Sequence, residues 1–86
     1  MNLDPNLVPL VEQARTDLAQ RLGSPAGSFT LKRAEAIEWP DASLGCPKPG
    51  IVYAQVLTPG YLIVLEANGK DYEYHADRRH VVYCEK

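Results

Sequence analysis

The two cysteines and two histidines are the most chemically reactive side chains in this sequence. Cys46 with His75 or His80 could act as a nucleophile and its base, and Asp77 could orient the histidine. The same side chains could bind zinc, but no CxxC spacing is present and the histidines are expected on either side of a turn. We favour a Cys46–Cys84 disulfide, because two cysteines allow one internal pairing. The alternative is a pair of reduced thiols that pack as small apolar groups.

A disulfide would have consequences for stability, chemistry and compartment. Closing a loop of this length would stabilise the fold by about 4 kcal/mol in the chain-entropy account. A bridged cysteine is not a free nucleophile, so we expect no enzyme activity. Disulfides persist in oxidising compartments, so we expect an extracytoplasmic location: periplasm, cell surface or secreted. The first residues, Met1 to Asp4, lack the basic and apolar regions of a signal peptide, so the export segment is expected to be absent here.

Residues 40–50 are rich in proline and glycine, which predicts a rigid loop rather than regular structure. The candidate binding residues in and beside this loop are Trp39, Asp41, Ser43, Leu44 and Lys48. With Leu44 exposed at the crest, the loop could dock a protein, since a preorganised segment loses little entropy on binding. In the alternative, Trp39 and Leu44 turn inward over the core, and Asp41 and Ser43 bond to amides of the loop.

Three other groups of side chains carry weaker signals. Asp41 with Glu73 or Asp77 could form the carboxylate pair of a glycosidase, but a chain this small offers little cleft. The tyrosines and Trp39 could stack on a glycan or peptide, although aromatic side chains on strands more often pack in the core. The Arg78-Arg79 pair could bind an anion, but charged turns are usually solvated. We expect no metal and no cofactor.

Length and composition exclude several classes of protein. The chain has 86 residues, 45% of them hydrophobic, and its 9 basic and 11 acidic side chains leave a net charge of −2. This size predicts one domain over residues 1–86 and excludes a multi-domain enzyme or a cofactor-binding α/β fold. The balanced charge argues against a nucleic-acid partner, and the hydrophobic content argues against disorder. No apolar run approaches the roughly 18 residues that span a membrane.

The elements that position these side chains begin with a helix over residues 7–22. Its apolar stripe consists of Leu7, Val11, Ala14, Leu18 and Leu22. The helix is expected to start near Pro9, which is tolerated in a first turn, and to end at Gly23. Residues 29–38 predict a strand, because Phe29 and Ile37 share the parity of one strand face.

From residue 51 to 84 the pattern predicts a β meander. Its expected strands are 51–57, 61–67, a third after Gly69, and 80–84. Residues 58–61 fit a type II turn, and Asn68-Gly69 is a strong hairpin signal. The expected fold is α+β: one N-terminal helix packed on a four- or five-stranded antiparallel meander sheet, with one disulfide.

The hairpin turn also sets the register of the two strands beside it. It places Leu65 opposite Tyr72 and Ile63 opposite Tyr74, and we expect the helix to cover the face that these four residues share.

The segment from Trp39 to Gly50 reads W-P-D-A-S-L-G-C-P-K-P-G, followed by P-G-Y at 59–61, Y-E-Y-H-A-D at 72–77, and Cys84. This pattern resembles a small bacterial domain family with a W-P-D-x-S-L-G-C-P-x-P-G signature, then P-G-Y and Y-x-Y-H-x-D. The resemblance covers roughly residues 29–84. The family occurs in exported proteins and lipoproteins and is uncharacterised. The resemblance therefore implies export, supports the Cys46–Cys84 bridge and carries over no catalytic residue.

The expected function is a structural or protein-binding role at the cell envelope. The alternative is inhibition of an extracellular peptidase through loop 40–50, which requires an exposed Leu44 followed by Gly45. The expected partner is an unidentified protein or none, without nucleic acid and without a membrane-spanning segment in this chain. The oligomeric state is left open by the sequence, because exposed sheet edges permit pairing without requiring it.

Overall fold

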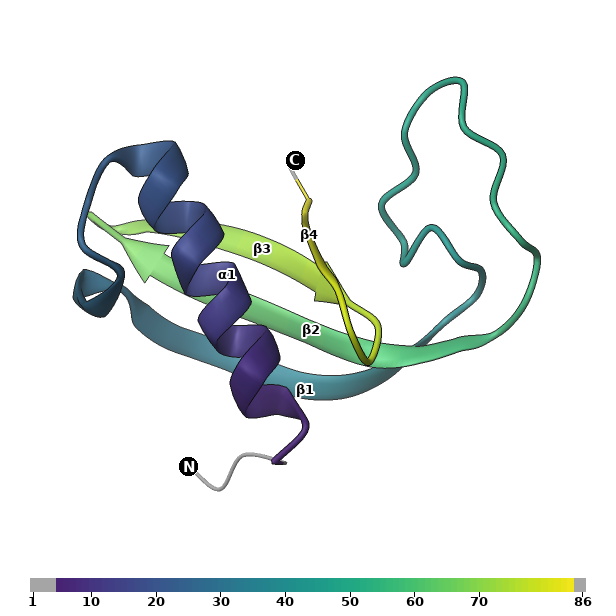
Figure 1. The fold of residues 1–86 in the computed structure, drawn as a ribbon, viewed down its shortest axis with the longest axis horizontal. Coiled ribbons are helices and arrows are strands. Elements are labelled where there is room, and N and C mark those ends of the chain that lie inside the picture. The colour runs from purple at the N-terminus through teal and green to yellow at the C-terminus, as the bar shows by residue number, and fades with distance from the viewer. Residues whose placement is uncertain (1–4, 85–86) are drawn as a thin grey trace.

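A computed structural model describes residues 5–84; the start of the chain, Met1 to Asp4, to which the export expectation refers, lies outside this range. The elements in chain order are α1 (Leu7–Leu22), the short 3-10 helix η1 (Ala26–Ser28), β1 (Thr30–Trp39), β2 (Thr58–Ala67), β3 (Lys70–Ala76) and β4 (Val81–Tyr83). The strands form one antiparallel sheet in the order β1-β2-β3-β4, and α1 crosses one face of it (Figure 1). The expected α+β fold is confirmed, with four strands.

The helix α1 spans the same residues as the predicted helix over 7–22 and ends before Gly23 as expected. Its apolar stripe is buried apart from Leu22, which is partly exposed. Gly23 takes the left-handed conformation (φ 66°), in which its N–H bonds to the carbonyl of Ala19. The expected start near Pro9 is wrong, because α1 begins at Leu7 and Pro9 lies inside its first turn. A proline costs little there, since the first N–H groups of a helix have no partner within it. Among residues 5–84, no helix is both long and apolar enough to cross a bilayer.

The β2–β3 hairpin has the predicted register. Leu65 lies opposite Tyr72 and Ile63 opposite Tyr74. The two turn residues, Asn68 (φ 54°) and Gly69 (φ 78°), both have the positive φ that a type I′ turn requires. The pairing places alternate residues on opposite faces of the sheet. We call the side under α1 the helix face and the other side the loop face.

The main core lies on the helix face. Its buried members are Leu7, Leu10, Val11, Ala14, Leu18, Phe29, Tyr61, Ile63, Leu65, Ala67, Tyr74 and Ala76. The prediction that the helix covers the face of Ile63, Leu65 and the tyrosines is confirmed. A second, smaller cluster on the loop face contains Trp39, Leu44 and Leu62, with Ile37 and Val82 packed against it. The loop face therefore has much less apolar packing to hold it together.

The predicted strand at 51–57 and the type II turn at 58–61 are both wrong. The structure has no regular secondary structure at 51–57, and the strand β2 begins at Thr58. The strand β1 pairs directly with β2, and Trp39 lies opposite Thr58, so residues 58–61 are part of a strand. The segment 51–57 has no partner strand, and strand propensity alone does not replace cross-strand contacts.

Candidate functional site

The connection between β1 and β2, residues 40–57, is the least regular part of the structure, and we call it the long loop. It extends away from the sheet at the end opposite the η1 turn (Figure 1). Loops longer than roughly 12–15 residues without secondary structure are uncommon and usually carry function or are disordered. This loop is fastened to the sheet at several points, which makes it the candidate functional site.

The first attachment of the long loop is covalent. Cys46 is bonded to Cys84, with 5.8 Å between their Cα atoms, which joins the loop to the residue after β4. The predicted disulfide is confirmed, so the zinc and free-nucleophile hypotheses for Cys46 do not hold in this state. Within residues 5–84, no cluster of three or more His, Cys, Asp or Glu side chains could hold a metal ion.

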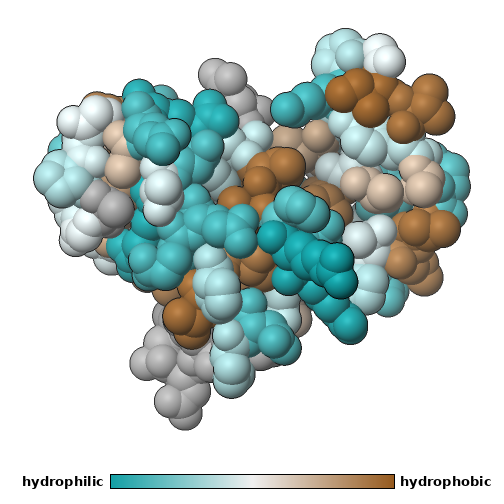
Figure 2. Space-filling model, in the orientation of Figure 1, coloured by the Kyte–Doolittle hydropathy of each residue, from teal (hydrophilic) through white to brown (hydrophobic). Residues whose placement is uncertain are grey.

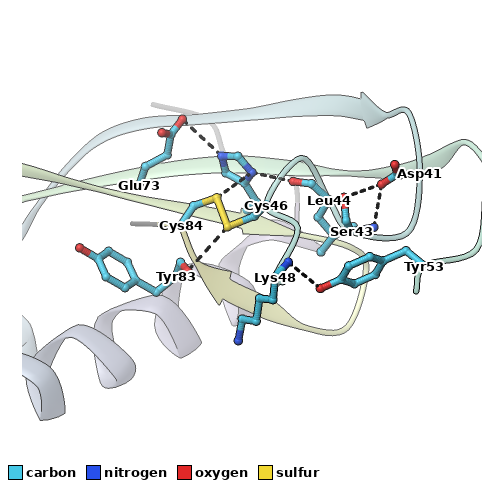
Figure 3. The surroundings of a disulfide bond; sticks show 10 residues. Asp41, Ser43, Leu44, Cys46, Lys48, Tyr53, Glu73, Tyr83 and Cys84 are labelled. Atoms are coloured by element: carbon cyan, nitrogen blue, oxygen red, sulfur yellow. Dashed lines mark hydrogen bonds and ion pairs between the residues drawn. A yellow bond between two sulfur atoms is a disulfide. The ribbon is translucent and has the colours of Figure 1, made fainter. Parts of the chain in front are cut away.

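The second attachment is His75, a buried residue of β3 on the loop face. Its Nδ1 lies 2.6 Å from the carbonyl oxygen of Leu44 and 3.5 Å from Sγ of Cys84 (Figure 3). Its Nε2 makes no hydrogen bond among the described residues and lies 3.3 Å from Oε1 of Glu73. The imidazole therefore contacts the loop backbone, the disulfide and a carboxylate at once. The sequence-based pairing of a histidine with Cys46 and Asp77 is not observed, because the sulfur beside His75 belongs to Cys84.

The third attachment is the indole of Trp39. It stacks on the His75 ring with 4.3 Å between centroids, and its Nε1 donates a hydrogen bond of 3.0 Å to the carbonyl of Ala76. Gly45 and Gly60 lie against the indole, and a Cβ on Gly45 would come within 2.9 Å of a ring carbon. At Gly60 a Cβ would clash with the carbonyl oxygen of Ala76 as well. Both glycines are thus required by close approach, which the turn interpretation of Gly60 missed.

Asp41 and Ser43 hold the base of the long loop through local hydrogen bonds. Oδ1 of Asp41 accepts the backbone N–H of Ser43 at 2.9 Å and also the hydroxyl of Ser43. These bonds lower the pKa of Asp41, first through the Ser43 hydroxyl and then through its N–H. Ala42 donates to the carbonyl of Ala54 at 3.0 Å, which closes the loop on itself. The loop is therefore held by hydrogen bonds between its own residues, which is the alternative described in the sequence analysis.

Leu44 is the point at which the inhibitor hypothesis fails. Its side chain is 6% exposed and packs with Trp39 and Leu62, so no apolar anchor stands at the crest of residues 40–50. Its backbone has φ 60°, followed by φ 71° at Gly45. The left-handed conformation is costly for leucine, and it persists because the surrounding contacts determine it. Leu44 thus covers the loop face of the sheet and is not presented to solvent.

The outer half of the long loop does present apolar groups. Val52 is 97% exposed, and Ile51, Val56 and Leu57 are each more than half exposed. Figure 2 shows hydrophobic groups gathered on the loop side of the molecule, among polar ones. The backbone N–H of Lys48 donates to the hydroxyl of Tyr53 at 3.1 Å, which ties this half together. We call Ile51, Val52, Val56 and Leu57 the apolar loop patch.

The comparison with protein families covers almost all of these features. The family model described as a domain of unknown function (DUF8738) matches residues 11–84. The chain belongs to the DUF8738 family. The matched range includes both cysteines, His75 and the whole long loop. No curated protein and no solved structure matches the chain.

The remaining candidate groups of this DUF8738 domain lie apart. Asp77 accepts N–H bonds from Arg79 (2.8 Å) and His80 (2.6 Å), and although its partial burial opposes the effect, these bonds lower its pKa. Asp41 is bonded to Ser43 and Glu73 faces His75, so the three carboxylates proposed for a glycosidase pair have separate partners. A hollow of about 350 Å³ beside Cys84 is lined by Arg33, Val64, Lys70, Asp71, Glu73 and Tyr83.

Some of the binding residues predicted from the sequence of this DUF8738 domain lie together in the structure, and other residues of the site were not predicted. The structure brings Trp39, Asp41, Ser43 and Leu44 together at the base of the loop, while the side chain of Lys48 is exposed on the outer half. Glu73 and the apolar loop patch were not among the predicted binding residues. The β-branched residues of 51–57 favour a strand, so no local signal in the sequence marked the patch as exposed.

Proposed function

We propose that this DUF8738 domain is an exported module that binds a protein partner at the cell envelope through the apolar loop patch. The observation that carries the proposal is the exposure of four large aliphatic side chains on one loop, with Val52 at 97%. Exposed apolar groups that gather on one side of a small protein are typical of interaction sites. The partner is therefore a protein surface with a complementary apolar region.

The attachments of the loop support a binding role for its exposed apolar side chains, because they hold the loop in one conformation. The disulfide, the His75–Leu44 contact and the Asp41–Ser43 bonds fix the base of the loop, and the Tyr53–Lys48 bond fixes its outer half. A segment that is ordered before it meets its partner loses less conformational entropy on binding. The edge of the sheet formed by β1 is less suited to docking than the loop. This strand carries charged side chains such as Lys32 and Arg33.

The export part of the proposal rests on the disulfide. Structural disulfides persist in secreted and periplasmic proteins and are rare in reducing compartments. The Cys46–Cys84 bridge joins the functional loop to the end of the sheet, so a reducing compartment would remove one of the attachments of the proposed site. The family resemblance noted from the signature supports the same location.

Site-specific photo-crosslinking in cells that produce the protein tests this function. A photoreactive residue replaces Val52, and the matched control replaces Gln20, which is exposed on α1. We expect a defined protein adduct from position 52 in the extracytoplasmic fraction and none from position 20. Excess purified wild-type domain should suppress the adduct, and a Val52→Asp domain should not. Absence of the adduct, equal adducts at both positions, or recovery of the protein in the cytoplasm would refute the proposal.

A further inference from the structure

The disulfide lies beside a histidine that is arranged to stabilise one of its two sulfurs as a thiolate. His75 is 6% exposed, and its Nδ1 lies 3.5 Å from Sγ of Cys84. The carbonyl of Leu44 accepts hydrogen bonds only, so the 2.6 Å contact places a proton on Nδ1. When the ring is doubly protonated, its Nε2–H faces Oε1 of Glu73 at 3.3 Å. Each N–H of the imidazolium then has an oxygen to face, and the positive charge lies against the bridge.

The other groups around this ring do not compete for that charge. The residues opposite His75 on the neighbouring strands, Leu62 on β2 and Val82 on β4, are both apolar. On β1, Arg33 and Glu35 form an ion pair with each other at 2.7 Å. The loop packed over the ring adds the carboxylate of Asp41, which is bonded to Ser43. Glu73 is therefore the charged group that the structure pairs with His75.

We propose that the Cys46–Cys84 bridge is a thiol–disulfide exchange site whose partner is a dithiol, either a small molecule or a pair of cysteines in a redox protein. The first thiolate of the dithiol attacks Sγ of Cys46 and forms a mixed disulfide, and the Cys46–Cys84 bond breaks with its electron pair on Sγ of Cys84. The second thiol then loses its proton and attacks the mixed disulfide, which releases Cys46 as a thiolate. The two protons that the dithiol has lost are taken up through solvent by Sγ of Cys84 and Sγ of Cys46. The dithiol is thereby oxidised to a disulfide, and the bridge is reduced to two thiols.

The direction of attack follows from exposure and from the position of His75. Cys46 is partly exposed, whereas Cys84 is 7% exposed, so an incoming thiolate reaches Cys46 more easily. A better stabilised thiolate also leaves faster, and a nearby cation stabilises a thiolate. The departing sulfur of Cys84 is the one that lies beside the imidazole. Reduction would release the long loop from β4, so exchange would act on the position of the loop.

The rate of reduction by dithiothreitol tests the proposal with the full chain. Samples are quenched by alkylation at intervals and weighed by mass spectrometry, and rates are divided by the thiolate fraction of the reagent at each pH. The variant is His75→Gln, and the matched control is His80→Gln, whose side chain is 76% exposed. At pH 6 we expect the wild type and His80→Gln to react at the same rate, and His75→Gln about tenfold more slowly. The difference should shrink as the pH rises, because an imidazole without its second proton carries no charge to stabilise the thiolate.

A purely structural role for His75 gives the opposite result. Loss of the ring would then loosen the loop, expose the bridge and speed its reduction at every pH. Equal or faster reduction of His75→Gln, or a rate ratio that does not change with pH, would overturn the proposal. If His75→Gln does not fold, Glu73→Gln takes its place, with a smaller slowing at pH 6 expected and no slowing as the contradiction.

Trapping the mixed disulfide identifies the attacked sulfur. The oxidised protein is treated briefly with cysteamine, a monothiol that has no second thiol in the same molecule to resolve the mixed disulfide, and the free thiol is alkylated at once, before peptide mapping. We expect cysteamine on Cys46 and the alkyl group on Cys84. Cysteamine mainly on Cys84 would overturn the assignment of Cys84 as the leaving sulfur.

Discussion

The two faces of the sheet are held by different kinds of interaction. On the helix face, α1 buries a continuous apolar stripe against Ile63, Leu65 and Tyr74, in the manner of an ordinary core. On the loop face, three buried apolar residues are accompanied by a disulfide, a buried histidine and an aspartate that accepts hydrogen bonds from Ser43. A small domain can thus keep a long irregular loop in place by replacing apolar area with a few specific bonds.

The largest expected effect is the loss of the bridge. The double variant Cys46→Ser/Cys84→Ser should lower the free energy of unfolding by about 4 kcal/mol, since the closed loop spans a sequence separation of 38 residues. Urea unfolding of both proteins, without reductant, measures the difference. A loss below about 1 kcal/mol would mean that the loop face is stable without covalent help.

A core truncation on the helix face should cost slightly less. Leu18 is fully buried on α1, so Leu18→Ala should lower the free energy of unfolding by about 3 kcal/mol. Under native conditions the rate of bridge reduction should stay at the wild-type value, because the two faces are held separately. A large acceleration of reduction in Leu18→Ala would show that the comparison between the faces is wrong.

The long loop contains one buried and one exposed aliphatic residue, Leu44 and Val52, whose truncations should have different effects on stability. Leu44→Ala removes a buried side chain from the smaller cluster and should cost about 2 kcal/mol. Val52→Ala changes a fully solvated side chain and should alter the free energy of unfolding by less than about 0.5 kcal/mol. Thermal and urea unfolding of both variants provide the test. Equal costs would mean that the apolar loop patch is packed in solution.

The smallest expected effect on stability comes from the titration of two carboxylates, Asp17 on the helix face and Asp41 on the loop face. Burial raises the pKa of Asp17, but hydrogen bonds from Arg21 and Tyr74 outweigh it, so its pKa lies below the ordinary 3.8. The pKa of Asp41 is also below 3.8 because of Ser43. A lowered pKa stabilises the fold above the ordinary value, and this stability is lost as the pH falls through 3.8 and below.

The side-chain substitutions that test these carboxylates are Asp17→Asn and Asp41→Asn. NMR titration of the wild type should give both pKa values below 3.8. Asp17→Asn should remove acid sensitivity from the chemical shifts of α1, and Asp41→Asn should remove it from those of residues 42–44. An ordinary pKa at Asp41 would show that its bonds to Ser43 are not kept in solution.

The helix face could be predicted from the sequence almost completely. The spacing of Leu7, Val11 and Leu18 depends on local periodicity, and Asn68-Gly69 sets the hairpin register within a few residues. The helix face is built from such short-range signals. The errors on this face were the expected start near Pro9, two residues late, and the type II turn at 58–61, which includes the core residue Tyr61.

The loop face could be predicted only in part, because its contacts join residues far apart in the chain. The disulfide was predictable from the cysteine count, and the Asp41–Ser43 bond from local turn chemistry. The contact of His75 with Leu44 and the stacking on Trp39 depend on how the long loop folds back. The strand expected at 51–57 is absent, because strand propensity in a sequence does not reveal whether a partner strand exists.

Native-state hydrogen exchange in the oxidised and reduced protein tests the different attachment of the two faces most directly. The informative amides are those of Ala42 and Cys46 in the long loop, and those of the β2–β3 ladder around Ile63. We predict that reduction lowers the protection of the loop amides by a much larger factor than that of the ladder amides. An equal loss at both places, or loop amides that keep their protection after reduction, would contradict the account.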